Sequence, residues 1–213
     1  IEGTADWFTS FGGTNHEEIK AMTIDSQGNI YAVGVFYGDL MIGDETIDHT
    51  EPGSSTPDAF VVSFDPMGEL RWVRTFGAVG ADIPFQIATD HQDHLYVAGY
   101  HHSDLTVGDE ILLAKGDIDS DLFIISYDMN GQLLWAKNWG GSNSESLGKL
   151  AINAAGDLFL AGTFQGNIQA DSLSAMTPII FGALSEIFVL AIDGVTHEAR
   201  WLTSFSGYGH DVP

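Results

Sequence analysis

The feature that most constrains the fold of this chain is a block of residues that returns at a nearly constant interval. A Trp is followed after three residues by an aromatic residue and then by two small residues, and the block begins at Trp7, Trp72, Trp135 and Trp201. Two further blocks recur in the same order, one at 24–34, 89–99 and 152–162, the other at 58–65, 121–128 and 186–193. Three blocks in fixed order, with a period of about 65 residues, identify an internal repeat.

Each repeat contains four short segments with the composition of β-strands. In the first repeat they lie around residues 19–24, 30–36, 59–64 and 70–76, and they are rich in β-branched and aromatic residues. Residues 25–29 supply the Asp and Gly that a tight reversal needs. No segment of helical length carries a sustained apolar period of about 3.6 residues. The sequence therefore predicts an all-β fold in which consecutive strands pair as hairpins.

Four antiparallel strands in about 65 residues form a unit whose two apolar faces must be covered by neighbours, which is the arrangement of a β-propeller. A β-sandwich does not need the same Trp and Gly at constant intervals, and a β-helix has a much shorter period. We predict one partial β-propeller over residues 1–213, made of about three blades. The repeats are expected at 12–77, 78–140 and 141–206, with the start of a further repeat at 207–213.

Two residues of the repeat have expected structural roles. The recurring Trp is expected to pack between adjacent blades. The glycines at Gly34, Gly99 and Gly162 are expected to allow close backbone approach near the narrow centre of the ring.

The residues also carry a family resemblance. The motifs are Trp-x-x-x-Phe-Gly-Gly, Asp-x-x-Gly-Asn-Ile-Tyr-Ala-Val-Gly and Asp-Ala-Phe-Val-Val-Ser-Phe-Asp. An acidic residue follows the first motif after four or five positions, at Glu17, Asp82, Glu145 and Asp211. Together they resemble the bacterial β-propeller repeat called SBBP, over essentially the whole chain. The resemblance implies a secreted protein or one displayed at the bacterial cell surface, with a scaffolding or adhesive role.

Two positions depart from this pattern. The second repeat has Asp93 where the turn Gly is expected, and the third has Asn153 in place of the leading Asp. These departures argue against an ion bound by the same turn in every repeat, but they do not affect the predicted fold.

The charge of the chain excludes some classes of partner. Thirty acidic residues against seven basic ones give a net charge of -23, so nucleic acids and anionic membrane surfaces are repelled. Cysteine is absent, which removes disulfides and thiolate chemistry. No run of residues approaches the roughly 18 apolar residues of a membrane span, so we expect no membrane insertion.

The end of the sequence bears on the partners of the propeller. Residues 205–213 align with 76–84, which lead directly into a strand of the second repeat. Three blades do not close a ring of four to eight blades and would leave apolar blade faces open to water. We therefore expect the remaining blades to come from a longer chain, and the alternative is another copy of the chain that completes the ring.

One acidic cluster is a candidate metal site. Asp117, Asp119 and Asp121 alternate in a loop that leads into a strand, which resembles the start of an oxygen-rich Ca²⁺ loop. The Gly and the distal Glu of an EF-hand are missing. The alternative is that these carboxylates are solvated turn residues.

A histidine cluster in the second repeat is a candidate Zn²⁺ site. His91, His94, His101 and His102 lie close in sequence, near two aspartates. However, adjacent histidines on a strand point to opposite faces. We expect these four side chains at the surface.

No sequence motif supports catalysis. The chain has no Gly-x-Ser-x-Gly elbow, phosphate-binding loop or zinc-protease motif. The sequence predicts a non-catalytic scaffold that binds a protein or glycan partner through loops such as 49–57 and 175–183, where the repeats differ. The alternative is a polysaccharide hydrolase or lyase with its site in the central channel.

Overall fold

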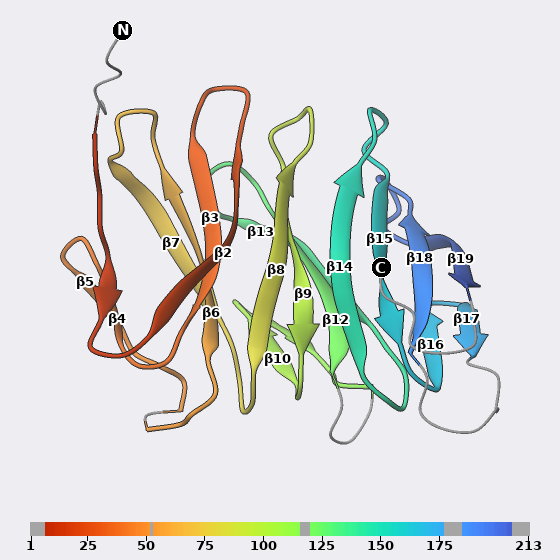
Figure 1. Cartoon of the computed structure of the whole chain (residues 1–213). Coiled ribbons are helices and arrows are strands. Elements are labelled where there is room, and N and C mark those ends of the chain that lie inside the picture. Colours follow the sequence, from red (N-terminus) through yellow and green to blue (C-terminus); the bar gives the residue numbers. More distant parts are fainter. Residues whose placement is uncertain (1–6, 52, 116–119, 177–184, 206–213) are drawn as a thin grey trace, which may run out of the picture.

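The computed structural model describes residues 7–51, 53–115, 120–176 and 185–205, and these form three antiparallel sheets of four strands each (Figure 1). The first sheet consists of β2 (Glu17–Ile24), β3 (Ile30–Phe36), β6 (Asp58–Phe64) and β7 (Leu70–Phe76). The second consists of β8 (Asp82–Thr89), β9 (Leu95–His101), β12 (Asp121–Tyr127) and β13 (Leu133–Trp139). The third consists of β14 (Glu145–Ile152), β15 (Leu158–Phe164), β18 (Glu186–Ile192) and β19 (Ala199–Phe205).

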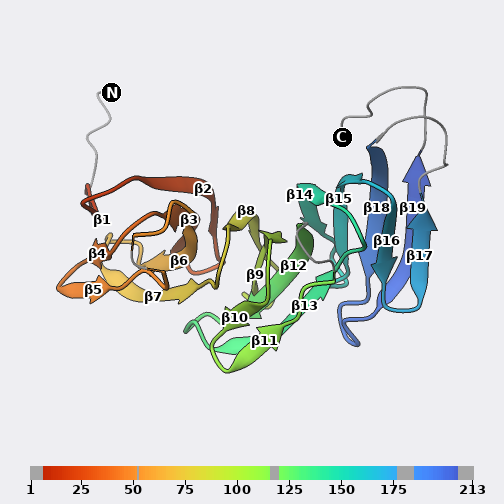
Figure 2. The same cartoon turned by 90° about the horizontal axis from the view of Figure 1, so that it is seen from below.

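In each sheet the spatial order of the strands follows the chain order, as in a propeller blade. The first strands β2, β8 and β14 lie next to one another, and the sheets stand side by side along a curved array (Figure 2). The predicted all-β propeller fold is confirmed. Within the described residues we find no helix that could cross a membrane.

Every described blade also contains a two-stranded hairpin, which was not predicted from the sequence. These hairpins connect the second and third strands of a sheet. They are β4 (Leu40–Ile42) with β5 (Glu45–Ile47), β10 (Leu105–Val107) with β11 (Glu110–Leu112), and β16 (Asn167–Ala170) with β17 (Leu173–Met176).

The two small residues after each Trp block cross from one blade to the next and pair with this hairpin. β1 (Gly12–Gly13) pairs with β4, Gly77 forms a bridge with Thr106, and Gly140 forms a bridge with Gln169. The ends of the first three Trp blocks thus pair with the hairpin of the blade that follows them in the chain, and adjacent described blades are linked by backbone hydrogen bonds.

The repeated glycine of the second strand lies opposite a β-bulge in the first strand. A Cβ atom on Gly34 would lie 2.2 Å from the carbonyl oxygen of Glu18 and 2.6 Å from the ring of Phe60. Gly99 and Gly162 face carbonyl oxygens at 2.1 Å in the same way. Since no side chain fits at these distances, the predicted close approach of backbones at these glycines is confirmed.

Apolar side chains fill the space between adjacent sheets. The cluster between the first two sheets contains Tyr31 and Val61 from the first and Val97 and Phe123 from the second, all with an exposed fraction of 0%. Complete burial of each such side chain contributes roughly 2 kcal/mol. The blades are therefore held together mainly by their apolar faces.

The recurring Trp lies between blades, as predicted. The indole Nε1 of Trp72 donates a hydrogen bond of 3.1 Å to the carbonyl oxygen of Met129, in the β12–β13 turn of the next blade. Its ring contacts Tyr31 in its own blade and Tyr127 in the next, with centroid distances of 5.8 and 6.3 Å. Trp7 makes the equivalent bond to the carbonyl oxygen of Pro66 at 3.0 Å.

The two departures from the repeat pattern have a structural explanation. Asp93 adopts a positive φ of 63° at the position where the first repeat has Gly28 with a φ of 84°. Its carboxylate accepts hydrogen bonds from N and Oγ of Ser26 in the neighbouring blade. Asn153 Oδ1 accepts from the N–H groups of Ala155 and Asp157, both at 2.9 Å. These turn side chains bind the backbone or the adjacent blade.

Candidate functional site

Buried carboxyl groups meet where one blade joins the next. Asp58, the first residue of β6, faces Asp82, the first residue of β8, and the N–H of Asp82 donates to the carbonyl oxygen of Pro57 at 3.2 Å. At the next junction the N–H of Glu145 donates to the carbonyl oxygen of Ser120 at 2.9 Å. Asp82 and Glu145, which follow the second and third Trp blocks, are thus enclosed between two sheets.

The environment of Asp82 favours its protonated form. The side chain has an exposed fraction of 0%, and Oδ1 has no hydrogen-bond partner among the described residues. The pKa of Asp82 is raised to about 7, chiefly by burial; the hydrogen bond from the N–H of Ala78 to Oδ2 opposes the rise, and the charges of Asp58 and Glu51 add to it.

The glycines of the Trp block leave room for these carboxyl groups. A Cβ atom on Gly77 would lie 2.4 Å from Asp58 Oδ1. A Cβ atom on Gly140 would clash with Asp121 Oδ1 and lie 2.9 Å from Glu145 Oε2. A glycine of the Trp block therefore lies against buried acidic side chains at each of the two described junctions.

The predicted calcium loop is only partly described. Asp117 and Asp119 lie outside the described residues, so the calcium site stays a prediction. Asp121 is buried, with an exposed fraction of 2%, and its Oδ2 accepts a hydrogen bond from the N–H of Lys115 at 2.5 Å. Across the described ranges, no group of three or more His, Asp or Glu side chains has the geometry to hold a metal ion.

The surface prediction for the histidines is wrong for His101, whose exposed fraction is 0%. It ends β9 at the place of Phe36 in the first sheet, so its ring fills an interior position. Nδ1 contacts the carbonyl oxygen of Ser103 at 2.5 Å, and Nε2 lies 3.2 Å from Asn138 Nδ2. His94 instead pairs with Asp90 Oδ2 at 3.1 Å.

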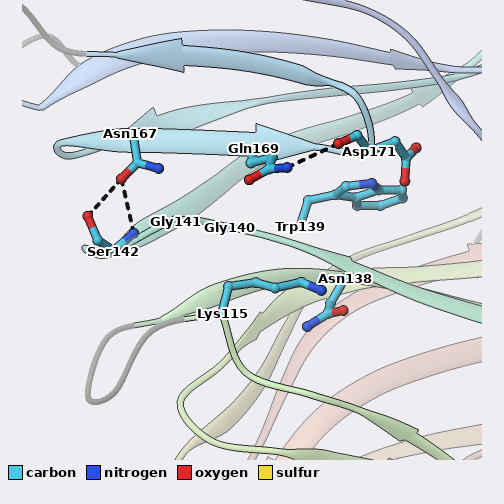
Figure 3. Close-up of a pocket in the computed structure, with 9 residues that line it drawn as sticks. All are labelled: Lys115, Asn138, Trp139, Gly140, Gly141, Ser142, Asn167, Gln169 and Asp171. Carbon is cyan, nitrogen blue, oxygen red and sulfur yellow. Dashed lines mark hydrogen bonds between the residues drawn. The ribbon is translucent and has the colours of Figure 1, made fainter.

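A polar cavity of about 410 Å³ lies between the second blade and the hairpin of the third (Figure 3). Lys115 and Asn138 line it from the second blade, and Gln169 and Asp171 line it from the β16–β17 hairpin. The remaining lining residues are Trp139, Gly140, Gly141, Ser142 and Asn167. A cavity of this volume falls in the usual range for small-molecule sites.

The cavity contains an unusual donor. Trp139, at the end of β13, has an exposed fraction of 2%, and its Nε1 makes no hydrogen bond within the described part of the chain. Figure 3 shows its indole extending toward Asp171 of the hairpin. A buried donor without a partner is costly, so a polar ligand or water in this cavity would stabilise it.

Sequence reasoning missed this cavity because it missed the hairpins. Their signal is present as a fourth recurring block with Gly-Asp at a tight turn, at 40–47 and 105–112. The third repeat has Ala-Asp-Ser in the corresponding segment, which concealed the match.

The sheets, their apolar interfaces and the blade-to-blade pairing together define a β-propeller repeat scaffold. No family model matches the chain. It is 24% identical over 243 residues to the "Uncharacterized WD repeat-containing protein L264" of Acanthamoeba polyphaga mimivirus, covering 89% of this chain and 17% of that protein. It is 27% identical over 150 residues to the "Regulatory protein FlaEY" of Caulobacter vibrioides, covering 68% of this chain and 15% of that protein.

The chain thus corresponds to less than a fifth of the length of either relative. WD repeats are propeller blades, so the name of the viral protein agrees with the fold seen here.

Proposed function

We propose that this chain is a non-catalytic propeller scaffold that binds a protein or glycan partner through its hairpins and loops. One observation carries the proposal: the blades share the strands that pack together, whereas the hairpin of the third blade departs from the block that the first two share, and single hairpin positions differ in all three. Tyr31 and Tyr96 occupy matching interior positions, whereas Met41, Thr106 and Gln169 occupy one matching hairpin position. Variation on exposed segments held by a rigid framework is typical of binding surfaces.

The position of Asp82, whose pKa is raised, supports a non-catalytic role for the buried carboxyl groups. A carboxyl group with a pKa of about 7 would suit a general acid, and Asp82 has such a pKa. However, Asp82 and Asp58 have exposed fractions of 0% and 1%. A substrate in a central channel does not reach groups enclosed between two sheets, so we assign these carboxyl groups a structural role.

A paired assay separates the scaffold from the alternative, a polysaccharide hydrolase or lyase. The chain is incubated with an array of immobilised glycans and, in parallel, with soluble polysaccharides. We expect retention on the array without new reducing ends or unsaturated products in solution. Product formation that increases with time and protein concentration would establish the enzyme instead.

We further propose that the protein is secreted or displayed at a bacterial cell surface. The resemblance of its repeats to SBBP repeats supports this location. Fractionation of the source cells tests it: antibody should label intact cells or the medium. Labelling confined to permeabilised cells would refute export.

We also propose that further blades pack against the third sheet. These blades come from a longer chain or from another copy of this chain. Phe159 and Val189 are only half-buried on its outer face, whereas their counterparts Tyr31 and Val61 are covered completely by the second sheet. The mass of the native protein in solution, compared with the 23.0 kDa of this chain, tests both sources. A monomer of that mass with no associated chain would contradict them.

A further inference from the structure

We propose that the cavity between β13 and the β16–β17 hairpin binds one neutral sugar residue of a glycan. This inference rests on the binding function proposed above and names its site and ligand class. Four observations support it: the residues that break the repeat, the backbone at Asp171, the buried indole N–H, and the balance of donors and acceptors.

The cavity is lined by residues that differ from those of the other blades. Gln169 forms the bridge to Gly140, and the matching hairpin positions carry Met41 and Thr106. Trp139 takes the place of Phe76, which ends the corresponding strand of the first sheet. Trp139 adds an N–H donor where the first blade has Phe76, and Gln169 puts an amide where the other blades have a thioether or a hydroxyl. Both side chains border the same cavity.

Asp171 is a third departure, and it strains the backbone. It adopts a φ of 53° at a turn where the other hairpins have Gly43 and Gly108, both with a φ of 60°. A residue with a side chain is disfavoured in this conformation, by roughly 1 kcal/mol. Such strain at a non-glycine residue is commonly found at functional sites. Its Oδ2 accepts a hydrogen bond from the N–H of Ala199 at 2.7 Å, which fixes the carboxylate.

The polar groups that remain for a ligand are both donors and acceptors. Both N–H bonds of the Asn138 amide are engaged, by the carbonyl oxygen of Leu113 and by His101 Nε2, which leaves Oδ1 as an acceptor. Asn167 Oδ1 accepts from N and Oγ of Ser142, which leaves its Nδ2 as a donor (Figure 3).

The indole N–H of Trp139 and the ammonium group of Lys115 are further donors at the cavity, and Asp171 Oδ1 is a further acceptor. Hydroxyl groups both donate and accept, so they match such a mixed set better than a phosphate or a carboxylate, which only accept. The charges of Lys115 and Asp171 cancel, which favours a neutral ligand. At Gly140 and Gly141 no side chain separates a ligand from the backbone.

The test uses a panel of methyl hexosides and methyl N-acetylhexosaminides, with binding measured by ligand-observed NMR and titration. Gln169→Thr replaces an exposed side chain by the residue of the second blade. Trp139→Phe introduces the residue of the first blade and removes the indole N–H together with part of the ring. Met41→Thr is the matched control, because Met41 occupies the same hairpin position far from this cavity in the chain.

We expect at least one glycoside to bind, with about tenfold weaker binding in each cavity variant and unchanged binding in Met41→Thr. Thermal unfolding of Gln169→Thr should match that of the unmodified chain. Failure of every glycoside to bind, or equal binding by Gln169→Thr and the unmodified chain, would overturn the cavity assignment. Retention on the glycan array that persists in both variants would leave the scaffold function intact while removing this site.

Discussion

Replacing Asp82 by Asn tests whether the blade junction holds a protonated carboxyl group. The side chain is fully buried, Oδ2 accepts one N–H bond from Ala78, and Asp58 and Glu51 add negative charge nearby. Folding therefore raises the pKa of Asp82 from 3.8 to about 7. An Asn side chain keeps an oxygen for the Ala78 bond and never ionises, so it reproduces the protonated state at every pH.

The sign and size of the effect follow from linkage. Because the pKa is raised on folding, the contribution of Asp82 to stability is complete below the unfolded pKa of 3.8 and is lost as the pH rises through about 7. One pKa unit corresponds to about 1.36 kcal/mol, so the whole loss amounts to about 4 kcal/mol, of which about 2.5 kcal/mol falls between about pH 5 and about pH 8.

Urea unfolding followed by Trp fluorescence measures this difference. Between about pH 5 and about pH 8, the ionisation of Asp82 should lower the free energy of unfolding of the unmodified chain by about 2.5 kcal/mol. Asp82→Asn should not show this part of the decrease. Asp109→Asn, in the exposed β10–β11 turn, controls for the loss of one charge. Parallel pH profiles for Asp82→Asn and the unmodified chain would refute the reasoning, because the carboxyl group would then be ionised inside the junction.

Three further predictions concern packing and titration. Gly34→Ala should lower the free energy of unfolding by about 2 to 3 kcal/mol, because its Cβ would meet a carbonyl oxygen at 2.2 Å; an unchanged urea midpoint would contradict this. Trp72→Phe should lower the free energy of unfolding by at least about 1 kcal/mol, measured in the same way, because it loses the hydrogen bond to Met129 and part of the ring packing against Tyr31 and Tyr127. Burial lowers the pKa of His101 from 6.5, so stability should fall as the pH drops through 6.5; His101→Phe should flatten that part of the profile, and a retained slope would assign it to another group.

The fold could be predicted because its determinants recur. Each Trp block and each run such as 58–65 repeats the same composition, and a fully buried strand such as β6 shows in the sequence as a largely apolar segment of seven residues. The hairpins could not be predicted in the same way, because β4 and β5 have three residues each. Three residues are too few to show a period of two.

The candidate site could not be predicted from the sequence because the residues that form it are far apart along the chain. The acidic residue after each Trp block was recognised as a repeated position, but its partner across the junction is 24 residues earlier in the case of Asp82 and Asp58. The cavity requires the register that places Gly140 opposite Gln169. That register is set by packing of the third blade on the second, so the sequence of one repeat does not reveal it.

The crossing of each Trp block into the following blade has a mechanical consequence. Tension applied along the chain at a junction must shear the pairing of Gly77 with Thr106 and also pull Trp72 from the turn at Met129. These attachments lie on separate elements of the next blade, a hairpin and a turn, so the load is divided between them. A row of blades joined in this way should yield one blade at a time under force, with the blades still docked keeping their shape while their neighbours extend.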